Sequence, residues 1–179
     1  MNEKSICILC GGEAIVETIT KEDVNFVKCE TCGKYYLGEP SELVKHYREK
    51  VPREKRAMLS AYTRERFERG EKPPVLGYPD EEIITEYENK TLDEKLENLI
   101  WYIKKKSSQF GDSVSWDARK DYPITYSLSP EGFTKIRDLA MEKDLLDWPA
   151  RGAGLKLKEE GWTLGKKLME REKEEKKSK

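Results

Sequence analysis

The sequence predicts an α+β protein, with a small β-rich part at the N-terminus and a larger, mainly helical part after it. Three observations support this prediction. All four cysteines lie within the first 32 residues, as two Cys-x-x-Cys pairs separated by short β-prone runs,. Apolar residues recur at helical spacing from about residue 42 onward,. In the last third of the chain, two helical patterns flank a glycine-rich turn between two short apolar runs,.

The composition restricts the class of protein. Charged residues make up 39% of the 179 residues and hydrophobic residues 36%, so two small cores joined by polar segments fit better than one large core,. No apolar run approaches the ~20 residues that cross a bilayer, and the first residues lack the apolar stretch of a signal peptide. We therefore expect a cytoplasmic protein without membrane contact. The net charge of −1 argues against coating of nucleic acid by bulk attraction, although a local basic patch remains possible,.

The cysteine spacing predicts a metal site. The four cysteines follow the pattern C-x2-C-x18-C-x2-C, as Cys7, Cys10, Cys29 and Cys32. Two residues between paired cysteines let one tight turn supply two thiolates, and four thiolates complete the tetrahedral shell of Zn²⁺. Glycine follows each pair, and its tolerance of positive φ lets backbone amides point at the thiolates,. The pattern thus predicts a zinc ribbon over residues 1–40 with one structural Zn²⁺, because no coordination position stays open for a substrate.

Other uses of paired cysteines agree less well with the pattern. In a reducing cytosol, clustered thiols hold a metal more often than they form disulfides. A redox pair needs one Cys-x-x-Cys, usually opening a helix after a strand, whereas this chain has two pairs that each continue into glycine,. A rubredoxin-type iron site uses similar turns and stays an alternative to zinc.

The predicted elements of the first 89 residues follow from local composition. Strands are expected over 14–19, 24–28 and 35–37, where β-branched and aromatic residues gather,. Residues 41–89 are predicted to form a helical connector and linker. Within them, two helices cover 42 to about 69 and separate near Val51-Pro52, prolines and glycines make 70–79 a linker, and a short helix is possible over 80–88,.

Residues 90–170 have the element order of a winged helix. Thr91 and Glu94 have the capping-box spacing, and Ser129-Pro130 opens a later helix,. The second helix of a helix-turn-helix is the least defined element, since only 117–121 could start it and Pro123 limits it. Residues 171–179 are a run of charge and are expected to be a solvated or frayed tail. The expected elements are a helix over 92–106, a strand over 114–116, a helix over 130–144, a hairpin over 145–157 and a helix from about 158.

Charge is unevenly distributed along the chain. Residues 42–72 hold ten lysines and arginines against six acids, whereas residues 80–97 hold two against eight. The second helix of this stretch, with the cations between Arg53 and Arg69, is therefore the best candidate for a phosphate-facing surface. An ordinary solvated helix face is the alternative. This helix is called the basic helix below. The helix over 130–144 has no surplus of positive charge. The hairpin over 145–157, which is the wing of a winged helix, adds a modest surplus. The residues predicted to contact nucleic acid are Arg53, Lys55, Arg56, Arg64, Arg66, Arg69, Lys135, Arg151 and Lys156.

The sequence contains no recognisable catalytic constellation. Its one histidine, His46, lies in a charged helical segment without a nucleophile motif,. Phosphate-binding glycine loops of the Gly-x-x-x-x-Gly-Lys-Ser/Thr and Gly-x-Gly-x-x-Gly types are lacking as well,. We therefore expect a protein that is not an enzyme.

Four segments together resemble a known arrangement of bacterial proteins. They are Cys7 to Ala14 (C-I-L-C-G-G-E-A), Tyr35-Tyr36 after the second cysteine pair, residues 59–66 (L-S-A-Y-T-R-E-R) and residues 155–162 (L-K-L-K-E-E-G-W). The chain resembles the zinc-ribbon and winged-helix region in front of nucleoside-deoxyribosyltransferase-like or TIR-like effector domains, some of them linked to defence against phage. No effector domain follows in this sequence, so the resemblance implies a sensing or adaptor role, with any enzyme supplied by a partner.

Two functions follow from this sequence. The first is a non-catalytic zinc-binding regulator or sensor that binds DNA or RNA through the winged helix and the basic helix. The second is a protein-interaction adaptor or dimerisation module, which the balanced charge and the acidic segment 80–97 favour.

Overall fold

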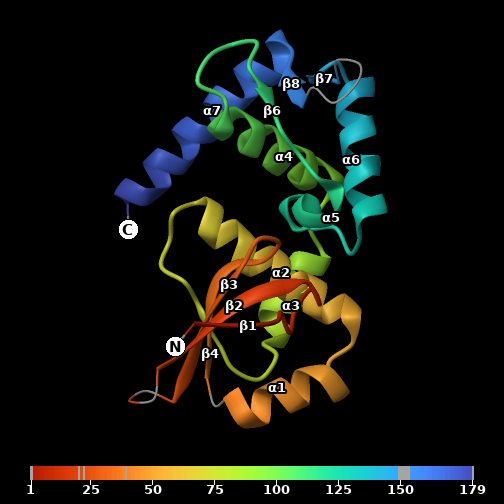
Figure 1. The fold of residues 1–179 in the computed structure, drawn as a ribbon. Helices are drawn as coiled ribbons and strands as arrows, with labels where there is room; N and C mark the ends of the chain where they lie inside the picture. Colours follow the sequence, from red (N-terminus) through yellow and green to blue (C-terminus); the bar gives the residue numbers. More distant parts are fainter. Residues whose placement is uncertain (1, 20, 22, 39, 149–153, 179) are drawn as a thin grey trace.

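The computed structural model describes residues 2–19, 21, 23–38, 40–148 and 154–178, and the chain has a mixed α+β architecture (Figure 1). A five-stranded sheet forms the N-terminal part, in the order β1-β2-β3-β4-β5. Neighbouring strands are antiparallel except β4 and β5. The strands are β1 (Asn2–Ile6), β2 (Glu13–Ile19), β3 (Val24–Cys29), β4 (Gly33–Gly38) and β5 (Val75–Leu76).

Each predicted strand of the first forty residues lies within a longer observed strand, whereas β1 and β5 were not predicted. β1 has a polar sequence and forms an edge through backbone pairing with β2. β5 lies in the predicted linker, where two residues pair with Tyr36 and Leu37 of β4. Neither segment carries a side-chain pattern that distinguishes a strand from a loop, because edge pairing uses the backbone alone.

Three helices complete the N-terminal part: α1 (Pro40–Glu49), α2 (Arg53–Glu68) and α3 (Glu81–Glu88). The helix break at Val51-Pro52 is confirmed. Helix α2 packs against β4 and α3 and also contacts the second part of the chain, so it lies between the sheet and the upper helices in Figure 1. One apolar core joins the inner side of the sheet to these helices, with Tyr35, Leu37 and Leu59 almost fully buried.

The second part has its own apolar core, centred on Leu99, Ile100 and Phe133. The predicted Thr91 capping box is present. A three-stranded antiparallel sheet has the order β6-β8-β7. The elements are α4 (Leu92–Lys106), β6 (Ser113–Val114), α5 (Ala118–Asp121), the 3-10 helix η1 (Tyr122–Thr125), α6 (Pro130–Glu142), β7 (Leu146–Asp147), β8 (Leu155–Leu157) and α7 (Glu159–Lys177).

Residues 171–177 are solvated, as one alternative of the tail prediction has it, but they are not frayed, because α7 continues to Lys177. Glu172 accepts a hydrogen bond from the Trp101 indole at 2.8 Å, and Lys176 donates to the Arg69 backbone carbonyl at 2.9 Å. Arg171 and Glu97 form an ion pair at 3.0 Å. These charged side chains lie against α4 and the end of α2, so tertiary contacts hold a segment that has no apolar stripe of its own.

Within the described ranges, no helix combines the length and the apolar character that crossing a membrane requires.

Candidate metal centre

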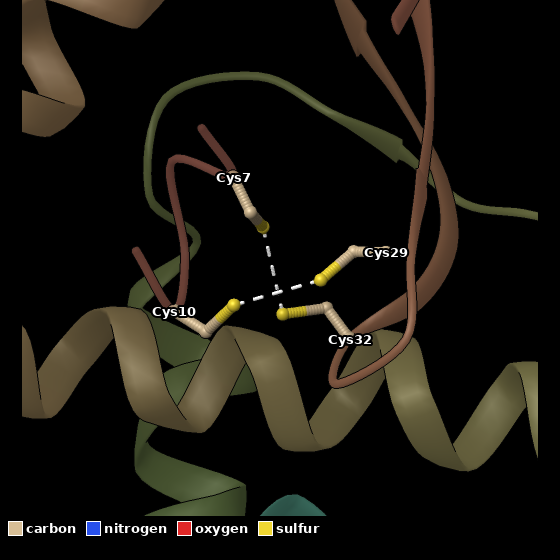
Figure 2. Close-up of side chains that lie close together, drawn as sticks. All are labelled: Cys7, Cys10, Cys29 and Cys32. Carbon is tan, nitrogen blue, oxygen red and sulfur yellow. Dashed lines mark hydrogen bonds between the residues drawn. The ribbon is translucent and has the colours of Figure 1, made fainter. Parts of the chain in front are cut away.

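The four cysteine thiols meet at one point beside α2. Their sulfur atoms all lie within 4.8 Å of one another. Figure 2 shows the first pair and the second pair approaching from two separate loops, with the side chains directed toward a common centre. The sulfur–sulfur distances are 3.6 Å from Cys7 to Cys32 and 3.5 Å from Cys10 to Cys29. A tetrahedron with metal–sulfur bonds of about 2.3 Å has edges of about 3.8 Å, so the thiols fit one tetrahedral metal ion.

A disulfide does not explain these distances. A sulfur–sulfur bond is about 2.05 Å long, whereas all four cysteines have free thiols. The predicted ligand set is therefore brought together as one possible metal site.

Glycine shapes both cysteine loops. Gly11 and Gly33 have φ angles of +76° and +79°, in the region that favours glycine,. In the first loop, the Gly11 amide donates to the Cys7 carbonyl at 2.9 Å, and the Gly12 amide points to the Cys10 sulfur at 3.4 Å. The local sequence thus creates a turn that presents two thiols and at least one amide to the same centre.

Burial protects the site from water. Cys32 is fully buried and Cys7 and Cys29 nearly so, while Cys10 is partly exposed. Hydrogen bonding, first with Cys10, lowers the pKa of Cys7, whereas burial raises the pKa of Cys32. A divalent cation that binds four thiolates here would displace any protons that the thiols carry.

Two hydroxyl groups contact the thiols, and sequence reasoning missed both. The Tyr35 hydroxyl lies 3.3 Å from the Cys7 sulfur, and the Ser60 hydroxyl lies 3.0 Å from the Cys32 sulfur. Burial raises the pKa of Tyr35, so this hydroxyl keeps its proton and can donate it in a hydrogen bond,. Tyr35 follows Cys32 closely in sequence, but Ser60 comes from the middle of α2, and no spacing pattern connects it with the cysteines.

Loss of the Ser60 hydroxyl should weaken metal binding without unfolding the protein. Because outer hydrogen bonds typically contribute about 10- to 100-fold to metal affinity, we expect Ser60→Ala to raise the dissociation constant by about tenfold. Competition with a chromophoric chelator measures this constant. Ser41→Ala, at an exposed position on α1, is the control. Equal metal affinity of the two variants would show that the Ser60 hydroxyl does not contribute to metal binding.

Arg64 joins the metal centre to the second part of the chain. Its side chain is only 7% exposed. It donates hydrogen bonds to the backbone carbonyls of Glu30 and Thr31, which lie between Cys29 and Cys32. It also forms ion pairs with Glu68 at 3.0 Å and with Asp121 of α5 at 3.2 Å. Arg64 is therefore a structural residue, and its inclusion in the predicted nucleic-acid surface is wrong because phosphate cannot reach it.

The other predicted basic residues of α2 are mostly engaged within the protein. Lys55 pairs with Glu81 at 2.7 Å, Arg66 with Glu71 at 3.2 Å and Arg69 with Glu65 at 2.9 Å. Arg56 donates to the carbonyl of Ile8, in the first cysteine loop, at 3.2 Å. Arg53 is exposed.

The predicted basic residues of the second part lie on other elements than those of α2. Lys135 is exposed on α6, and Lys156 is partly exposed on β8. Arg151 lies outside the described residues. One basic surface that joins these residues to the exposed cations of α2 stays a prediction.

Comparison of this chain with protein-family models, with curated proteins and with solved structures finds no match.

Proposed function

We propose that this protein is a non-catalytic adaptor, in which a zinc ribbon and a winged helix form one unit that binds a protein partner. Zn²⁺ is the metal that a closed set of four thiolates fits best, and in such a site it has a structural role. The carbonyl contacts of Arg64 then link the ribbon to the winged helix.

The order of strands supports a winged helix in the second part. Its sheet places the last strand in the middle, as β6-β8-β7, with α6 directly before β7. The segment before α6, where the sequence predicts the second helix, contains only the four-residue α5 and then η1. Pro123 in η1 explains this shortening, since proline does not continue an α-helix. Helix α6 occupies the position of the recognition helix.

The charge of α6 is the observation on which the choice of partner depends. Its exposed side chains are Glu131, Lys135, Asp138 and Glu142, so acids outnumber bases. Arg137 is buried. It is paired with Asp138 and lies 5.0 Å and 4.6 Å from the rings of Trp116 and Trp148, respectively. A helix that enters the major groove needs cations toward the phosphates. The face of α6 therefore favours a protein over duplex DNA.

Site-specific photo-crosslinking tests this proposal. A photoreactive amino acid replaces Lys135 or Glu142 in the full chain, expressed in its host cells, and Lys167 on α7 is the control position because it is exposed on another element. We expect protein adducts at positions 135 and 142 that are not found at 167. Binding of a 20-base-pair duplex that Lys135→Glu abolishes, or the same adducts at all three positions, would contradict the proposal.

A further inference from the structure

The outer face of the N-terminal sheet is exposed, although several of its side chains are apolar. The helices of this part pack on the other face, together with the buried side chains of Val27, Tyr35 and Leu37 (Figure 1). On the outer face, Ile15 is 44% exposed and Val75 67% exposed, while Phe26 and Tyr36 are partly exposed. Isolated apolar residues are common on surfaces, whereas a set aligned across neighbouring strands suggests a binding surface.

Strand pairing arranges this face in two parallel rows. The first row crosses β1 to β4 as Lys4, Ile15, Lys28 and Lys34. The second crosses β2 to β5 as Glu17, Phe26, Tyr36 and Val75. Residues two apart on a strand share a face and are separated by about 7 Å, so a row of cations runs beside a row with two aromatic rings.

The aromatic and basic side chains of the two rows contact each other. The rings of Phe26 and Tyr36 have centroids 4.8 Å apart, and Lys28 Nζ lies 5.1 Å from the Phe26 centroid. Lys34 Nζ lies 5.4 Å from the ring of Phe67 on α2. No ion pair of Lys4, Lys28 or Lys34 is found among the described residues. These cations are therefore available to a ligand.

We infer that this face binds single-stranded nucleic acid, which goes beyond the proposed contact of α6 with a protein. Unpaired bases stack on aromatic side chains, while lysines beside them neutralise the phosphates. Phe26 and Tyr36 supply rings for the bases, and Lys28 and Lys34 beside them supply charge for the phosphates. Lys4 lies at the far edge of the sheet. A duplex keeps its bases stacked inside and cannot use the aromatic row. An acidic protein could use the lysines but would not need two adjacent, partly exposed rings.

Fluorescence polarisation with labelled 15-nucleotide poly-dT and poly-U, at low salt, tests this inference on the full zinc-loaded chain. We expect at least one of the two single strands to bind more tightly than a 15-base-pair duplex. The ratio of the poly-dT and poly-U affinities shows whether the face prefers DNA or RNA. Tyr36→Ala should lower the affinity about tenfold, within the range for loss of one stacked base. Tyr78→Ala, at a position that is 59% exposed and whose ring packs against His46 of α1, is the matched control.

The salt dependence provides a second, independent test that does not alter the aromatic pair. The double variant Lys28→Ala/Lys34→Ala should reduce the slope of log affinity against log salt by about 1.4, because each phosphate contact with a single strand contributes about 0.7. The control is the double variant Lys166→Ala/Lys167→Ala, at two exposed positions of α7, which should leave the slope unchanged. Circular dichroism and zinc content establish that each variant is folded.

Three results would overturn the inference. They are equal affinity for duplex and single strands, no binding of any probe up to about 100 µM at low salt, and equal effects of the sheet variants and their controls. If Tyr36→Ala instead converts a dimer into a monomer and no nucleic acid binds, the face is an interface between two copies of this chain, and the inference is equally wrong.

Discussion

Replacement of Cys32 by serine should abolish metal binding and unfold the N-terminal part. Cys32 is fully buried at the centre of the thiol cluster, where a serine hydroxyl is a poor metal ligand,. Binding of Zn²⁺ to four-ligand sites supplies on the order of 10 kcal/mol to the folding of small domains, as much as the whole stability of many proteins. Elemental analysis should find one zinc per chain in the wild type and none in the variant.

Hydrogen exchange shows which elements lose their structure in the Cys32→Ser variant. Backbone amides of β2, β3 and β4 should lose protection in Cys32→Ser, while those of α4 and α6 should keep most of theirs, because these helices belong to a separate apolar core,. A strong chelator should have the same effect on the wild type. Ser5→Ala, at an exposed position just before the first cysteine pair, is the control. Unchanged stability of Cys32→Ser, together with no zinc in the wild type, would contradict the metal centre.

Replacement of Arg64 by methionine should cost about 3–5 kcal/mol of unfolding free energy. The change leaves Asp121 buried without its cation, and Glu68 keeps only the lysines at its edge, Lys105 at 3.5 Å and Lys106 at 3.1 Å. Removal of one partner from a buried ion pair has a cost in this range, because the remaining charge stays desolvated. Burial already raises the pKa of Asp121, and Arg64 is the cation that opposes this shift. Denaturant unfolding measures the difference.

The matched control for Arg64→Met is Arg53→Met. Arg53 lies on the same helix but is exposed, so this variant should differ from the wild type by no more than about 0.5 kcal/mol,. A double-mutant cycle with Asp121→Asn then isolates the pair, and we expect a coupling energy of about 1–3 kcal/mol. Equal stability of the two methionine variants, or a coupling energy near zero, would show that Arg64 does not connect the two parts.

Local chemistry made many elements predictable. The cysteine spacing indicated the ligand set, since two residues between thiols permit few turn geometries, and glycine in the two loops has the positive φ that was expected. Thr91 and Glu94 predicted the start of α4 because both partners of a capping box lie within one helical turn,. The helix break at Val51-Pro52 followed from the missing amide of proline.

Surface assignments were less predictable, because the exposure of a charged side chain depends on what packs against it. The arginines of α2 form a basic stretch in the sequence, yet Arg64 is buried, while Arg66 and Arg69 pair with acids. The same limitation applies to the end of α7, where charge alone suggested a frayed tail and contacts with Trp101 and Arg69 hold a helix.

The sequence by itself determined which four cysteines could share a metal site, where α4 and α6 begin, and the mixed α+β class, because these depend on residues that are neighbours in the chain. Only the tertiary structure decided which cations are available, that Ser60 of α2 reaches Cys32, and that Arg64 joins the cysteine loop to α5. It also decided that Lys28 and Lys34 lie beside Phe26 and Tyr36 on the outer face of the sheet, through the register of β3 and β4. These contacts join residues far apart in sequence or depend on strand register, and no local pattern encodes them.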